Sequence, residues 1–148
     1  MKDKAIIFDW IGTLYERDKG LFSFSKEVLI NLHPYYKLGL ISKRKNPGTG
    51  YLEIQRTGIV DYFDSIIIAR RKTLTEFKKC LAELDLTPEC VAVVGDRTIR
   101  EIRIGNVLGC TIYWIKAGEH SSELPNRRTG QPNYVINSIN DLSDFLLS

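Results

Sequence analysis

The sequence has few of the features that mark secreted, membrane-bound or thiolate-metal proteins. Its three cysteines, Cys80, Cys90 and Cys110, form an odd set without C-x-x-C spacing. Each lies in or beside an apolar stretch, so we interpret them as reduced core residues. The first apolar run covers only residues 5–8, far less than the hydrophobic region of a signal peptide, and no run is long enough to cross a membrane. These absences predict a cytoplasmic protein.

A strong charge imbalance is also lacking. The formal net charge is +3, which is too small by itself to indicate a nucleic-acid-binding or membrane-binding protein. With 43% hydrophobic and 26% charged residues, the composition argues against a disordered or fibrous chain. The length is common for one domain, and we find no internal repeat, so we expect residues 1–148 to form a single domain.

Apolar runs bounded by turn residues recur along the chain, and most are continuous rather than alternating. Continuous runs are typical of parallel strands that are buried on both faces. We expect strands at residues 5–8, 38–41, 66–68, 91–94 and 111–115, and a weaker edge strand at 134–136.

Helical patterns lie between these strands, at residues 25–32, 50–57, 74–84, 98–108 and 141–147. Alternating strands and helices predict an α/β fold: a doubly wound, Rossmann-like parallel sheet with helices on both faces. In such sheets ligands bind beyond the carboxyl ends of the strands. We therefore searched for reactive residues at those ends.

The first two strands end in residues that suit phosphate chemistry. Asp9 follows the first strand and precedes the turn at Gly12, which would project its carboxylate into the crevice; it is a candidate nucleophile. Ser42 ends the second strand and could donate a hydrogen bond to a phosphoryl oxygen.

The next two strands supply a cation and further carboxylates. Arg70, Arg71 and Lys72 follow the third strand, and we favour Lys72 over Arg71 as the cation that pairs with Asp9 and with phosphate. The fourth strand ends in Gly95-Asp96, with Glu101 about one helical turn further on. Oxygen-rich strand ends side by side suit a hard cation such as Mg²⁺.

In this order the four motifs resemble those of the haloacid dehalogenase (HAD) superfamily, over roughly residues 5–136. The resemblance implies that Asp9 is the nucleophile that forms an aspartyl-phosphate and that Ser42 and Lys72 orient the phosphoryl group. It also implies a Mg²⁺ site made by Asp9, the backbone carbonyl of Ile11 and Asp96. Glu101 would be a metal or water-shell carboxylate, at a place where the family more often has Asp.

One departure from the family pattern limits the functional prediction. Phosphatases of this family usually carry a second Asp two residues after the nucleophile, as a general acid and base, and here that residue is Ile11. Losing such a group typically lowers the rate by about 10²- to 10⁴-fold. The leading hypothesis is a Mg²⁺-dependent phosphohydrolase that acts through Asp9. The alternative is a catalytically weakened member that binds a phosphorylated ligand or a protein partner.

Dehalogenases of this family carry a sizeable helical cap domain, often inserted between the first and second motifs. Segments 14–37 and 42–72 are too short to hold such a cap. The resemblance therefore implies an open active face and argues against a dehalogenase. An open site is closed by a bulky substrate, a macromolecule or a neighbouring subunit, so oligomerisation stays an open alternative. Basic residues after the second, third and fourth strands favour a phosphorylated small molecule or macromolecule as ligand. Nucleic-acid ends stay open, although no stacking platform is visible. His120, in a polar loop, receives no role.

Overall fold

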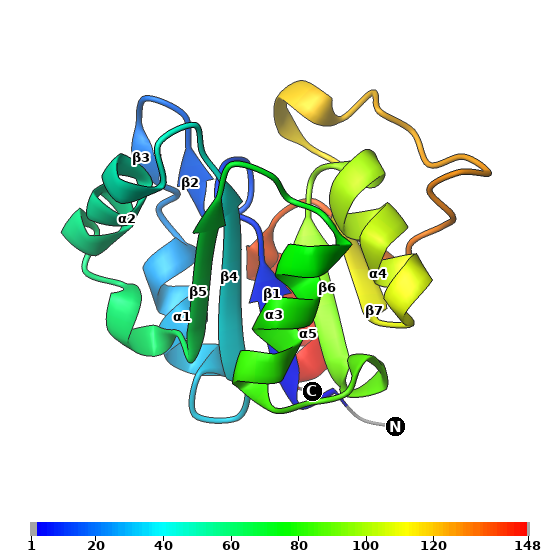
Figure 1. Cartoon of the computed structure of the whole chain (residues 1–148), viewed down its shortest axis with the longest axis horizontal. Helices are drawn as coiled ribbons and strands as arrows, with labels where there is room; N and C mark the ends of the chain where they lie inside the picture. Colours follow the sequence, from blue (N-terminus) through cyan, green and yellow to red (C-terminus); the bar gives the residue numbers. More distant parts are fainter. Residues whose placement is uncertain (1–2, 148) are drawn as a thin grey trace.

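The centre of the molecule is a six-stranded parallel sheet, as the computed structural model of residues 3–147 shows (Figure 1). The strand order is β5-β4-β1-β6-β7-β8. The bounds are β1 (Ala5–Phe8), β4 (Lys37–Lys43), β5 (Ser65–Ala69), β6 (Val91–Gly95), β7 (Thr111–Ile115) and β8 (Tyr134–Ile136). The chain builds the sheet outward from β1 in one direction and then in the other, so the switch point of this doubly wound sheet lies at β1.

Helices cover both faces of the sheet (Figure 1). One face packs against α1 (Ser25–Leu32), α2 (Pro47–Arg56) and α5 (Leu142–Leu146), and the other against α3 (Leu74–Leu84) and α4 (Arg103–Leu108). All four residues of β1 are buried: Ile6 and Phe8 join the core on the first face, whereas Ala5 and Ile7 join the core on the second. Burial on both faces explains the continuous apolar runs.

Helix α3 has the bounds that the sequence predicts, because both its ends carry strong local signals. Thr73 caps its N-terminus in a capping box with Glu76, and the helix ends at Asp85, which has a left-handed backbone conformation. Phe77 and Leu84 are among the side chains that it buries against the sheet. This cap also fixes the backbone directly after Lys72.

Apart from shifts of one or two residues at the ends of elements, the structure differs from the predicted elements in three places. A two-stranded hairpin, β2 (Tyr15–Glu16) and β3 (Gly20–Leu21), follows β1; each strand is too short to show an alternating pattern. Helix α2 begins at Pro47, earlier than predicted, because Asn46 caps it. The helix predicted at 98–108 begins as a π-helical turn, η3 (Thr98–Ile102), before α4.

Short 3₁₀ turns complete the chain: η1 (Val60–Tyr62), η2 (Pro88–Cys90), η4 (Gly118–His120) and η5 (Ile139–Asp141). The three cysteines are buried and form no disulfide. Among residues 3–147, every helix is too short or too polar to span a membrane.

Candidate active site

The backbone register brings three of the predicted site residues to the same level of the sheet. Phe8 lies opposite Leu40 on β4 and Val94 on β6, so Asp9 is level with the residues just before Ser42 and Asp96. The backbone N–H of Asp9 extends this pairing by donating to the carbonyl of Val94, at 3.1 Å. The first, second and fourth motifs therefore meet at adjacent strand ends.

Asp9, Lys72 and Glu101 form a buried charged cluster at this end. The Lys72 ammonium donates to Asp9 Oδ1 at 2.7 Å and to Glu101 Oε1 at 2.8 Å. The Lys72 and Glu101 side chains are each 1% exposed. Arg71, the alternative to Lys72, is exposed. The cation that contacts Asp9 is therefore the lysine.

The cluster holds Asp9 in its charged form. Burial works to raise the pKa of Asp9, but the charge and hydrogen bond of Lys72 outweigh it and keep this pKa below its usual value. Burial likewise works to lower the pKa of Lys72, but the negative charges of Asp9 and Glu101 raise it above its usual value. An ionised carboxylate is what a nucleophile at this position needs.

Asp96 lies beside Asp9, as the metal hypothesis requires. Burial, together with the charge and a hydrogen bond of Asp9, raises the pKa of Asp96 to about 7. Gly12 makes room for it: a Cβ at position 12 would collide with the Asp96 carboxylate, and the backbone there has φ +84°. Two carboxyl groups in contact need a shared cation for both to be charged.

Glu101 reaches the cluster from the π-helical turn η3, and its side chain fits there because residue 95 is a glycine. A Cβ at Gly95 would collide with the Glu101 side chain. Burial raises the pKa of Glu101 to about 8; Lys72 opposes this shift, whereas the charge of Asp9 adds to it. In this structure Glu101 pairs with Lys72, the same ammonium that pairs with Asp9, and its carboxyl group also contacts that of Asp9.

Unpartnered oxygens at this end fit a hard divalent cation. Within residues 3–147, three buried side-chain oxygens lack a hydrogen-bond partner, and all three belong to this end of the sheet: Thr13 Oγ1, Asp96 Oδ1 and Glu101 Oε2. No group of three or more His, Cys, Asp or Glu side chains in the described chain could hold a metal ion by itself. A Mg²⁺ ion here would thus draw on Asp9, Asp96 and oxygens that do not come from side chains.

A cleft of about 570 Å³ opens above these residues. Asp9, Ile11, Ser42 and Asp96 all line it. Ser42 is 2% exposed, and its hydroxyl makes no hydrogen bond to another described residue, which leaves it available to a ligand. Ile11 places an apolar side chain where the family's second Asp would stand, so the described cleft has no acid at that position.

Sequence reasoning missed the contacts of Trp10. Its backbone N–H donates to Asp9 Oδ1 at 2.8 Å, and its indole N–H donates to Glu53 of α2 at 2.9 Å. Glu53 in turn accepts from Arg44 at 2.6 Å. Trp10 is fully buried and stacks on Tyr15, so it fixes the loop that carries the nucleophile. No local pattern signals a pair 43 residues apart.

A second missed residue is Glu123, in the loop between η4 and β8. Its carboxylate accepts from the backbone N–H and hydroxyl of Thr98, at 2.7 and 3.0 Å, and pairs with Arg97. It thereby caps the turn that carries Glu101. His120, for which we predicted no role, also lines the cleft. His120 lies 3.6 Å from Glu119.

The segments in which a cap would be inserted hold small elements. Between β1 and β4 lie the hairpin β2-β3 and helix α1, and between β4 and β5 lie α2 and η1 (Figure 1). The fold therefore has no cap domain at either place, as the sequence predicts.

Comparisons with known proteins agree with this geometry. A family model described as HAD-hydrolase-like matches residues 73–142. The glyceraldehyde 3-phosphate phosphatase of Pyrococcus furiosus is 28% identical over 116 residues, which cover 75% of this chain and 48% of that protein. The chain thus spans about half the length of this curated relative.

Solved structures share the fold of this chain. A HAD phosphatase from Thermococcus onnurineus superposes with a TM-score of 0.79 at 18% identity, covering 97% of both chains. A HAD-hydrolase of Bacillus subtilis, in a structure bound to magnesium, gives a TM-score of 0.73 at 18% identity, covering 86% of this chain and 56% of that one. Together with the motif residues assembled around Asp9, these matches support a HAD-like superfamily member.

Proposed function

We propose that this protein is a Mg²⁺-dependent phosphohydrolase that acts through an aspartyl-phosphate on Asp9. The observation that carries the proposal is the contact of a buried, ionised Asp9 with both Lys72 and Asp96. The matched relative from Pyrococcus furiosus is a phosphatase, which supports the reaction class.

The side chains present have distinct tasks in this reaction. Asp9 Oδ1 accepts hydrogen bonds from Trp10 and Lys72, which orient the carboxylate that would attack phosphorus. The new P–O bond forms as the bond to the leaving alcohol breaks, and water then hydrolyses the aspartyl-phosphate to free phosphate. Lys72 and Ser42 would stabilise negative charge on the phosphoryl oxygens.

The residues that would hold Mg²⁺ are Asp9, Asp96 and the backbone carbonyl of Ile11, whereas Glu101, the other predicted metal residue, pairs with Lys72. When bound, the ion supplies positive charge that offsets repulsion between the carboxylates and the phosphoryl group. The Bacillus subtilis structure, which shares the fold, was determined with magnesium bound.

Ile11 restricts which esters this site would hydrolyse quickly. Without an acid at that position, a poor leaving group must depart without a proton from the family's usual donor. Aryl and acyl phosphates need less protonation and should react best. The second candidate function, a weakened member that binds a phosphorylated ligand, rests on this same residue.

The test is hydrolysis of p-nitrophenyl phosphate with and without Mg²⁺, by the wild-type protein and by Asp9→Asn. We expect Mg²⁺-dependent release of p-nitrophenol that the variant loses. Equal activity in Asp9→Asn would exclude Asp9 as the nucleophile. No activity in the wild type, together with retained phosphate binding, would support the binding function.

A further inference from the structure

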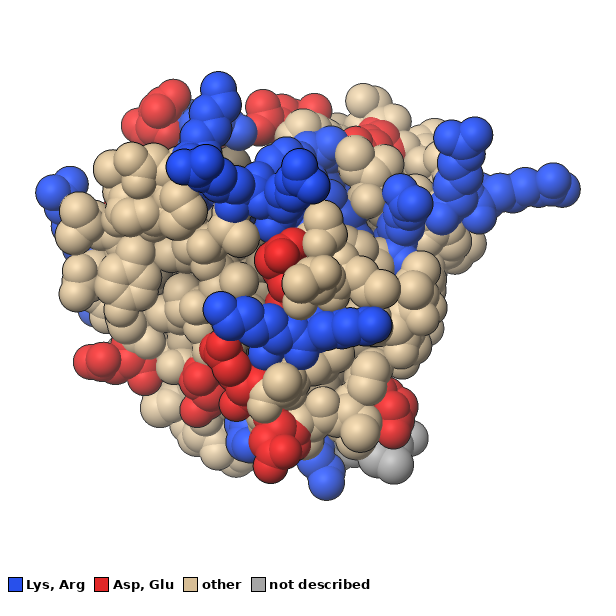
Figure 2. Space-filling model, in the orientation of Figure 1, with Lys and Arg blue, Asp and Glu red and all other residues tan. Residues whose placement is uncertain are grey.

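The cleft over Asp9 carries more positive charge than one reacting phosphoryl group needs. Seven Lys and Arg residues line it against four Asp and Glu residues. Lys72, which contacts Asp9, lies beneath the cleft and is not among the seven. Figure 2 shows basic side chains gathered at the top of the view, where the strands of the sheet end.

Three of the seven cations are already paired. Arg44 pairs with Glu53, Arg97 with Glu123, and Arg17 with Glu119. The other four form no ion pair with any residue that the structure describes, and we call them the unpaired rim: Lys43, Lys45, Arg70 and Arg100. Like charges held together without counter-charges destabilise a fold, so a shared ligand is the simplest reason for this grouping.

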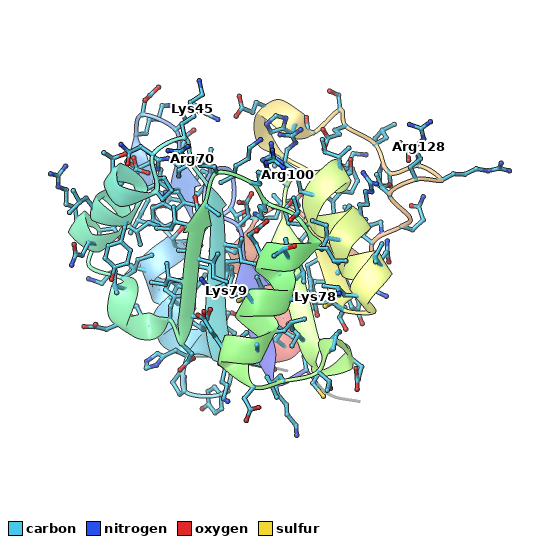
Figure 3. All side chains as sticks on the ribbon, in the orientation of Figure 1. Lys45, Arg70, Lys78, Lys79, Arg100 and Arg128 are labelled. Atoms are coloured by element: carbon cyan, nitrogen blue, oxygen red, sulfur yellow. The ribbon has the colours of Figure 1, made fainter. Side chains whose placement is uncertain are left out.

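The rim is assembled from three separate strand ends, which makes a chance run of basic sequence a poor explanation. Lys43 ends β4 and Lys45 follows it, Arg70 follows β5, and Arg100 lies in η3 after β6. In Figure 3, Lys45, Arg70 and Arg100 come to the same end of the molecule, whereas Lys78 and Lys79 lie on α3 and Arg128 lies on the distant loop.

The rim and the reacting centre are different parts of the cleft. Ser42, which lines the cleft, and Lys72, which contacts Asp9 beneath it, are both buried. Lys43, Lys45 and Arg70 are exposed, and Arg100 is half-buried. A phosphoryl group that contacts Asp9 is served by Ser42 and Lys72, so the rim is left for another part of the same molecule.

Resting on the proposed function, we propose that the substrate is a small phosphate ester with a second anionic group, a phosphate or a carboxylate, which the unpaired rim binds. The N-terminus of α2, where Asn46 and Thr49 also line the cleft, adds the positive end of a helix dipole. A phosphate monoester without a second anionic group would leave the rim without a counter-charge.

The same lining favours a small polyanion over single-stranded nucleic acid. Among the described residues of the cleft, Tyr15 is the one Phe, Tyr or Trp side chain. Its ring already stacks on Trp10, with ring centroids 4.9 Å apart. Proteins that bind single strands without sequence preference present aromatic faces to successive bases. This cleft offers charge without such a platform.

The test compares two ligands that differ by one phosphate, fructose 6-phosphate and fructose 1,6-bisphosphate, with Mg²⁺ present. Equilibrium binding to Asp9→Asn is measured by calorimetry, so that the result does not depend on turnover, and kcat/KM is measured for the wild type. With exposed charge pairs contributing modestly each, we expect the bisphosphate to be favoured by about 10-fold, and less at high salt.

The matched variants each remove three positive charges. Lys45→Gln, Arg70→Gln and Arg100→Gln together should abolish the preference for the bisphosphate. Lys78→Gln, Lys79→Gln and Arg128→Gln together change the net charge equally, outside the cleft, and should retain it. An equal loss in both triple variants would show a general effect of net charge and would overturn the proposal.

Two further outcomes separate this inference from the proposed function. Hydrolysis of p-nitrophenyl phosphate without any preference for the bisphosphate would overturn the inference and leave the function standing. A bisphosphate preference in binding, with no hydrolysis of any ester, would support the rim and overturn the function. Tighter binding of a 5′-phosphorylated hexanucleotide than of the bisphosphate would overturn the choice of a small ligand.

Discussion

At the scale of single residues, Lys72 determines how the carboxylates of the site can be charged. It lies between Asp9 and Glu101, in a region with almost no contact with solvent. Removing one member of a buried ionic group leaves the others without compensation, and this is more damaging than the pair is stabilising. Lys72 is therefore a structural as well as a chemical requirement.

Replacing Lys72 by Met should lower both stability and activity. We expect a loss of about 3 kcal/mol in the free energy of unfolding, at the lower end of the usual range because Glu101 can take up a proton. Urea denaturation measures this loss. The neighbouring variant Arg71→Met alters an exposed side chain and should stay within about 0.5 kcal/mol of the wild type. Equal effects in the two variants would contradict the assignment of Lys72.

Position 11 is where a substitution can supply the missing general acid and base. Ile11→Asp should raise turnover of alkyl phosphates, whose leaving groups need a proton, by at least about 10-fold, while p-nitrophenyl phosphate gains little. Steady-state kinetics with both substrates measures the change. Ile11→Asn is the control, because it has the shape of Asp without its proton. A gain in the Asn variant as large as in the Asp variant would point to polarity and not to proton transfer.

At the scale of elements, the site depends on loops that are held by single acidic side chains. Glu53 ties α2 to the loop after β1, and Glu123 ties the loop after η4 to the turn η3. Neither contact could be predicted from the sequence, because each joins residues that are far apart along the chain. The strands and α3 were predicted well because burial on two faces and a capping box are local signals.

The stabilisation that Glu123 provides through its contacts with Arg97 and Thr98 should depend on pH. Partial burial works to raise the pKa of Glu123, but hydrogen bonds from Arg97 and Thr98 outweigh it and hold this pKa below the ordinary value of 4.5. A lowered folded-state pKa means that the stabilisation is present above pH 4.5 and is lost as the pH falls through the folded-state value.

Glu123→Gln imitates the protonated state at neutral pH. We expect trypsin to cleave after Arg127 and Arg128, both exposed on this loop, roughly 3- to 10-fold faster than in the wild type. Glu119→Gln is the control, because its pair with Arg17 is largely exposed to solvent. Unchanged cleavage in Glu123→Gln would show that the loop is held by other contacts.

At the scale of the whole molecule, metal binding and folding should be coupled. Mg²⁺ that binds only the folded chain stabilises it by about 2.7 kcal/mol at 100 times its Kd, which corresponds to a rise in Tm of about 5 °C or more. Scanning calorimetry at increasing Mg²⁺ concentration tests this. Asp96→Asn should lose the response, yet be more stable than the metal-free wild type at neutral pH because it lacks a carboxyl group whose charged form is disfavoured next to Asp9.

Equal responses to Mg²⁺ in the wild type and in Asp96→Asn would exclude Asp96 from the metal site.

The convergence of Asp9, Lys72 and Asp96 could be foreseen because parallel strands end at one edge. Glu101 was foreseen as a carboxylate near the metal, but its contact with Lys72 was not, because it depends on the π-helical turn.

The Glu101 side chain fills the space that a side chain at position 95 would need, because a Cβ at Gly95 would collide with it. A glutamate at position 101 therefore requires a glycine at position 95. A relative that acquires alanine at position 95 has to shorten or redirect the acid at position 101, so the two sites should change together as lineages diverge.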